Sequence, residues 1–206
     1  TYAGNLDLEA EENRTIEAGF EVKLFSNKLN LTSVAFYREE KSAIEYYSNP
    51  ITYEASYFNA DGKYNSKGVE TTISYAINPQ INLNANYTFT QVEDKAVNNT
   101  FPNVRANLHN PKHKVNLAID YQFTPRAFVG VNYQYLGKRQ GFMGYPPVVS
   151  MMDAYQLLNT IAKYELIKNR MTVFATVTNI TNEDFVEVVG YSTKGRNFKV
   201  GLNLNF

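Results

Sequence analysis

The only two histidines of the chain, His109 and His113, are four residues apart, which is the spacing of a metal-binding pair on a helix. Pro111 lies between them, and the glutamate of a helical His-Glu-x-x-His motif is missing. The two histidines together with Ser150 or Asp153 could in principle form a hydrolytic site. No motif links these residues, so we expect no metal site, no catalytic residue and no cofactor.

The composition excludes several classes of protein. With no cysteine in 206 residues, disulfides, thiolate metal sites and cysteine nucleophiles are excluded. Lys plus Arg number 20 and Asp plus Glu number 20, a balance that argues against a polyanion binder and predicts no nucleic-acid partner. The chain has no run of 18 apolar residues that could form a membrane-spanning helix. The 16 Tyr and 13 Phe favour β-structure.

Apolar and polar residues alternate with a period of two along much of the chain, which indicates strands and not helices. The alternation is clean at 15–24, 81–90, 114–123 and 197–206, and weaker at 29–40, 66–77, 127–137, 154–166 and 171–180. The chain therefore reads as all-β, with about nine antiparallel strands.

The connections between these strands alternate in length. Short turns lie near 26–28, 78–80, 124–126 and 167–170, with the Pro and Asn of tight turns. Long polar segments lie at 41–65, 91–112, 138–153 and 181–196. Short turns at one end and long loops at the other are typical of an outer-membrane β-barrel. The alternative is a soluble β-sandwich or jelly roll, which scatters its long loops over both ends.

The two faces of the expected strands suit lipid on one side and a wet lumen on the other. The lumen-facing set is mostly Asn, Thr, Gln and Ser with isolated charges, namely Glu17, Glu21, Lys23, Lys114, Asp120, Lys163 and Lys199. The lipid-facing set includes Val115, Leu117, Ile119, Phe198, Val200, Leu202, Leu204 and Phe206. Because lipid cannot satisfy open sheet edges, such a sheet must belong to a closed barrel with the bilayer as its partner.

Three segments carry a resemblance to a known family. They are Leu6–Glu12 running into Thr15–Gly19, then Pro111-Lys112-His113-Lys114, and Asn179–Phe185 followed by Gly190-Tyr191 and Gly195–Phe198. Their sequences and their order resemble TonB-dependent outer-membrane receptors, with departures at Ala10, Asn13 and Phe185. The stretch Val188–Arg196 is similar to the endings of cobalamin receptors, and siderophore receptors share much of it.

The resemblance implies that residues 1–206 form the C-terminal portion of a larger transmembrane barrel of about 22 strands, plugged by a domain that is absent from this chain. An odd count of nine strands agrees, since it places residues 1–13 at the long-loop end and the C-terminus at the short-turn end. Implied partners are the plug domain and the TonB energy-coupling complex, with a surface lipoprotein as a further candidate. Implied location and function are the Gram-negative outer membrane and import of siderophore-iron or a cobalamin-like ligand. The alternatives are a complete small barrel with a structural or adhesive role and an outer-membrane hydrolase.

Two places could contact a ligand or partner. The segment 141–147 combines two glycines and two prolines with Phe142, Met143 and Tyr145, which offer adaptable apolar contact. Tyr191 and Arg196 lie in the last long loop. The competing interpretation is that the first segment packs on neighbouring loops and that Arg196 binds loop carbonyls. For the lumen charges, we expect pairing with one another or with the plug.

Overall fold

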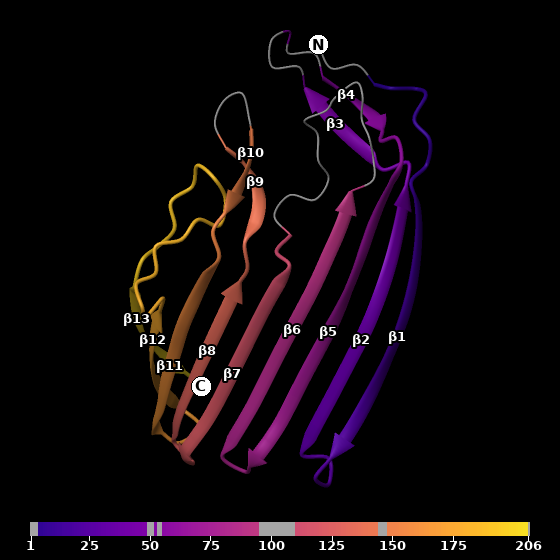
Figure 1. The fold of residues 1–206 in the computed structure, drawn as a ribbon. Coiled ribbons are helices and arrows are strands. Elements are labelled where there is room, and N and C mark those ends of the chain that lie inside the picture. Colours follow the sequence, from indigo (N-terminus) through magenta and orange to yellow (C-terminus); the bar gives the residue numbers. More distant parts are fainter. Residues whose placement is uncertain (1–3, 49–51, 53–54, 95–109, 144–147, 206) are drawn as a thin grey trace.

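The computed structural model describes residues 4–48, 52, 55–94, 110–143 and 148–205, and every regular element in these ranges is a β-strand (Figure 1). No helix in these ranges is long and apolar enough to cross a membrane. The strands are β1 (Glu12–Leu24), β2 (Leu29–Lys41), β3 (Ile44–Ser48), β4 (Ala55–Asn59), β5 (Lys63–Asn78), β6 (Ile81–Asp94), β7 (His113–Thr124), β8 (Ala127–Leu136), β9 (Arg139–Met143), β10 (Val148–Met152), β11 (Tyr155–Ile167), β12 (Met171–Thr178) and β13 (Asn197–Leu204).

Nine of these strands form one antiparallel sheet in the order β1-β2-β5-β6-β7-β8-β11-β12-β13. They correspond one for one to the nine predicted strands. Two short hairpins, β3–β4 and β9–β10, stand apart at the long-loop end (Figure 1). Both hairpins lie in segments that the sequence predicts to be long loops, because strands of five residues are too short to establish a period of two.

Asparagine and threonine side chains form the tight turns at the other end of the sheet. Asn78 Oδ1 accepts hydrogen bonds from the backbone N–H groups of Gln80 and Ile81, at 2.8 and 2.9 Å. Thr124 Oγ1 accepts from those of Arg126 and Ala127. Such side chains replace the missing ladder bonds where a strand reverses. The turns therefore match the positions and the chemistry predicted from sequence.

The first and the last described residues lie at opposite ends of the sheet (Figure 1). Asn5 Nδ2 donates to Tyr57 O at 2.9 Å, and the Glu9 N–H donates to Asn59 Oδ1 at 2.8 Å, so residues 5–9 lie against the β3–β4 hairpin. Asn205, which follows β13, donates its N–H to Arg170 O in the last tight turn. The described residues thus confirm the expected placement of the two ends.

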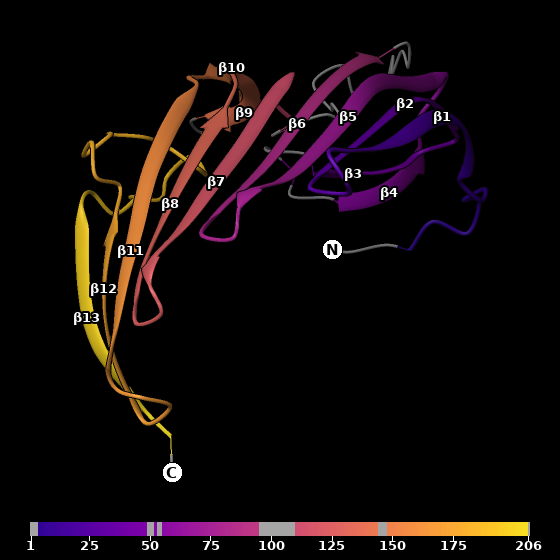
Figure 2. The same ribbon diagram turned by 90° about the horizontal axis from the view of Figure 1, so that it is seen from below.

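The register brings the apolar positions of neighbouring strands into continuous rows. One row crosses seven strands through Val22, Leu31, Ile73, Ala85, Leu117, Tyr133 and Leu158. The sheet is a single curved layer (Figure 2), and its apolar side chains are not covered by a second layer of the described residues. Val200 is 75% exposed. A soluble β-sandwich would bury this face against a second sheet, so the fold contradicts that alternative.

Candidate functional site

The polar face of the sheet carries the seven charged positions predicted to face a lumen. Glu17, Glu21 and Lys23 lie on β1, Lys114 and Asp120 on β7, Lys163 on β11 and Lys199 on β13, all at alternate positions to the apolar rows. A hollow of about 490 Å³ on this face is lined from five neighbouring strands and includes Arg38, Glu70 and Lys114. A hollow lined from five neighbouring strands agrees with a sheet that curves around its polar face, and Figure 2 shows that the sheet is curved.

The charges on this face are accessible and only partly paired. Lys23 Nζ lies 3.2 Å from Glu21 Oε1, with about half of each side chain exposed, so this ion pair contributes little to stability. Lys163 Nζ lies 5.2 Å from the centre of the Phe128 ring, and Lys199 Nζ lies 5.9 Å from that of Phe174. These ammonium groups keep donors available for a partner on the concave side.

Glycines on the same face allow large side chains to lie flat against the wall. Phe36 is paired with Gly68, and Phe174 is paired with Gly201. A Cβ atom added at Gly201 would lie 2.3 Å from Phe174 Cζ, and one at Gly68 would lie 2.6 Å from Phe36 Cζ. Each ring therefore occupies the space above its paired glycine and does not project into the concave side.

Arg139, at the start of β9, forms hydrogen bonds with the last long loop. Only 3% of this residue is exposed. Its Nη2 donates to Val186 O at 2.7 Å and to Glu187 O at 3.2 Å. The guanidinium also lies over the Tyr155 ring, whose centre is 4.6 Å from that of Phe185. The sequence does not reveal the role of Arg139, because its partners are loop carbonyls 47 and 48 residues away.

Two asparagines close the base of this loop, which runs from 179 to 196. Asn179 is 4% exposed and has a positive φ of 51°. Its Oδ1 accepts from the Glu183 N–H at 2.8 Å, and its Nδ2 donates to Glu183 O at 2.9 Å. Asn182 Oδ1 accepts from the Arg196 N–H at 2.9 Å. The Asn-rich segment that carried the family resemblance therefore has a structural role.

Tyr191 lines a second hollow of about 510 Å³ at the loop end, together with Met151, Met152, Val186 and Val189. Tyr191 is 75% exposed, and Met151 is also exposed. This partly apolar hollow can take a ligand or a partner side chain. Tyr191 therefore lines a hollow, and its contact with a ligand or partner stays a prediction.

The structure describes the other predicted contacts only in part. Phe142 and Met143 end β9, where their backbones pair with Val149 and Val148. Tyr145 lies outside the described residues. The backbone N–H of Arg196 donates a hydrogen bond to Asn182 Oδ1.

Two further predicted residues, His109 and Phe206, lie outside the described residues. His113 begins β7 in the apolar rows, and its Nδ1 lies 2.9 Å from the Tyr87 hydroxyl. The structure therefore gives His113 an aromatic neighbour on the outer face of the sheet.

Comparison with known proteins supports the fold. A family described as TonB dependent receptor-like, beta-barrel matches residues 1–180. The pyoverdine outer membrane receptor FpvA from Pseudomonas aeruginosa superposes with a TM-score of 0.75 at 19% identity, over 97% of this chain and 30% of the receptor. The ferric-catecholate import receptor Fiu from E. coli gives 0.73 at 19%, over 98% and 29%. The FrpB iron transporter from Neisseria meningitidis gives 0.74 at 17%, over 100% and 32%.

The chain therefore spans less than a third of these receptors, and likenesses at such identities show the fold alone. The family match is independent of them and covers most of the chain. It agrees with the antiparallel sheet, the short turns at one end and the polar concave face. The chain belongs to the family of TonB-dependent receptor β-barrels.

Proposed function

We propose that this chain forms wall and outer loops of an active transporter in the outer membrane of a Gram-negative bacterium. The observation that carries the proposal is the division of the sheet into two faces. Rows of uncharged, mostly apolar side chains run across the outer face, and polar side chains with isolated charges line the concave face. This is the arrangement that a barrel wall between lipid and an aqueous lumen requires.

The height of the uncharged band supports a membrane-spanning role. On β1 the outward positions from Ile16 to Leu24 carry no charge. The eight steps from residue 16 to residue 24 extend about 26 Å at about 3.3 Å per step. A strand tilt of about 40° reduces the height along the membrane normal to about 20 Å. Adding the reach of the side chains brings the band close to the apolar band of about 25 Å in outer-membrane barrels.

The concave face is where the separate plug domain would dock. Glu17, Lys114, Asp120 and Lys199 would contribute charge-assisted hydrogen bonds to it. The chain itself supplies no reaction step. Energy would come from the TonB complex acting on the plug, and the barrel would hold the plug and the outer loops in place.

The proposed ligand class is a bulky iron chelate, with a cobalamin-like compound as the second candidate. The related structures bear the names of pyoverdine, ferric-catecholate and iron transporters. The hollow at Tyr191 and the segment 141–147 would contribute apolar contacts at the loop end. A surface lipoprotein is the alternative occupant of the same loops.

Uptake of labelled ligand tests this function. The gene for the full-length protein is deleted and restored in its host, and cells are supplied with radioactive iron as ferric pyoverdine or a ferric catecholate, or with labelled cobalamin. We expect one of these to enter only when both the gene and TonB are present. Equal uptake of all three ligands with and without the gene would contradict the proposal.

A further inference from the structure

The charged residues in the four tight turns of the nine-stranded sheet are all basic. Lys28 lies between β1 and β2, Arg126 lies between β7 and β8, and the turn between β11 and β12 contains both Lys168 and Arg170. All four residues are exposed, and none of these turns, which the structure describes in full, contains Asp or Glu. The turns therefore carry positive charge only, and two of the four charges belong to the turn between β11 and β12.

Hydrogen bonds of the backbone hold the turn between β11 and β12 in place. The Arg170 N–H donates to Ile167 O at 2.9 Å, and the Asn205 N–H donates to Arg170 O at 2.9 Å. Glu165, at the end of β11, accepts from a backbone N–H of the turn. Among the described residues, neither Lys168 nor Arg170 forms an ion pair. Both side chains therefore retain their donors for an outside anion, on a turn that is already ordered.

A third hollow, of about 740 Å³, lies at this turn. It is lined by the turn with its flanking residues and by the end of β13, namely residues 167–171, Leu204 and Asn205. The register pairs Ile167 with Met171 and Met171 with Leu204, which makes one apolar row on the outer face. The next outward row, farther from the turn, is Tyr164, Val173 and Leu202. The two basic residues therefore border a hollow that adjoins the exposed apolar rows of the sheet.

Aromatic side chains gather at the same end of the sheet. The exposed Phe25 ring lies 6.2 Å from the Tyr75 ring, and the exposed Phe123 ring lies 4.0 Å from the Tyr121 ring, measured between ring centres. Such residues concentrate where a membrane meets water. In the proposed membrane location the short turns face the periplasm, so their basic side chains lie at the headgroup level of the inner leaflet.

We propose that the hollow at the turn between β11 and β12 binds an anionic phospholipid of the inner, periplasmic leaflet. Lys168 and Arg170 donate charge-assisted hydrogen bonds to its phosphodiester. Its acyl chains lie along the outward rows that begin with Ile167, Met171 and Leu204. A soluble phosphate would use the two basic residues but would gain nothing from the apolar rows. This inference rests on the membrane location in the proposed function.

Native mass spectrometry of the full-length protein in detergent, titrated with phosphatidylglycerol, tests the proposal. Each basic side chain near an anionic lipid strengthens binding about fivefold, so Lys168→Gln/Arg170→Gln should weaken binding by roughly 30-fold at low salt. The matched control is Lys28→Gln/Arg126→Gln, which removes the same charge from two turns at the same end that do not line the hollow. This control should bind as tightly as the unchanged protein.

Three further results bear on the lipid site. Phosphatidylethanolamine with the same acyl chains should bind the unchanged protein more weakly than phosphatidylglycerol does, because the basic side chains repel its ammonium group. Millimolar glycerol 3-phosphate, which has no acyl chains, should not displace phosphatidylglycerol. If the double variant misfolds, the single variants Lys168→Gln and Arg170→Gln should each weaken binding about fivefold.

Unchanged affinity in folded Lys168→Gln/Arg170→Gln, an equal loss in the control, equal affinity for the two lipids, or full displacement by glycerol 3-phosphate would each overturn the lipid site. These outcomes are separable from a failure of the proposed function. A protein that imports ligand but whose phosphatidylglycerol affinity is unaffected by Lys168→Gln/Arg170→Gln overturns only the lipid site. A protein that binds phosphatidylglycerol as expected but imports none of the offered ligands overturns only the transport function.

Discussion

Replacing Asn179 by alanine should release the base of the last long loop. The substitution removes two hydrogen bonds of 2.8 and 2.9 Å to Glu183 and a longer one of 3.4 Å to Lys194 O. At about 1 kcal/mol for each short bond, these account for about 2 kcal/mol. Alanine at a φ of 51° adds about 1 kcal/mol of backbone strain, so local opening should become easier by about 3 kcal/mol.

Hydrogen–deuterium exchange of the full-length protein in detergent measures this change. An opening free energy lower by about 3 kcal/mol accelerates exchange roughly 150-fold, and the effect should be confined to amides of residues 179–196. Asn179→Gly keeps the positive φ accessible and should give about 30-fold.

The control for Asn179→Ala is Asn169→Ala, at another asparagine with positive φ, 58°, in the tight turn at the opposite end. It should accelerate exchange only in its own turn. Unchanged protection of the loop in Asn179→Ala, or equal acceleration in every loop, would refute the reasoning.

Three further changes test other parts of the account. Gly201→Ala should force the Phe174 ring off the wall and destabilise the folded protein by about 1–3 kcal/mol in urea unfolding, and an unchanged midpoint would contradict the observed packing. Val200→Arg, at the middle of β13, should cost about 2–4 kcal/mol in bilayers, whereas Asn203→Arg on the concave face should cost much less; equal costs would contradict the assignment of faces. Deleting residues 141–147 should weaken ligand binding without impairing barrel assembly, and unaltered affinity would remove this segment from the binding surface.

The nine long strands could be predicted because each keeps one face against one medium over eight or more residues. The strand β13 shows this most clearly, with Phe198, Val200, Leu202 and Leu204 on a single side. The hairpins β3–β4 and β9–β10 could not be predicted, since five residues inside a polar segment carry too little pattern.

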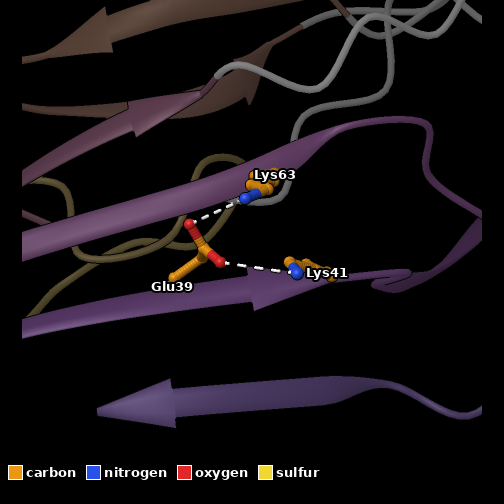
Figure 3. A network of polar contacts seen from close by, with 3 residues as sticks. All are labelled: Glu39, Lys41 and Lys63. Atoms are coloured by element: carbon orange, nitrogen blue, oxygen red, sulfur yellow. Dashed lines mark hydrogen bonds and ion pairs between the residues drawn. The ribbon is translucent and has the colours of Figure 1, made fainter.

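The candidate site was less predictable than the sheet. Tyr191 was singled out because it lies in the last long loop, and the structure places it at a hollow. Arg139 could not be identified, because its burial depends on loop carbonyls nearly 50 residues away. The contact of Glu39 with Lys41 and Lys63 (Figure 3) was also missed, since it depends on the pairing of β2 with β5, whose register the sequence alone does not give.

Oxygen accessibility of neighbouring positions on β13 tests the central claim, that the outer face meets lipid, most directly. The chain contributes no cysteine, so Val200→Cys and Lys199→Cys can each carry one spin label in the full-length protein reconstituted in bilayers. Val200 belongs to the exposed apolar rows, and Lys199 belongs to the concave face. Oxygen concentrates in lipid, so it should relax the label at 200 strongly and the label at 199 weakly. A label at 200 that is shielded from oxygen, or that behaves like the label at 199, would contradict the account.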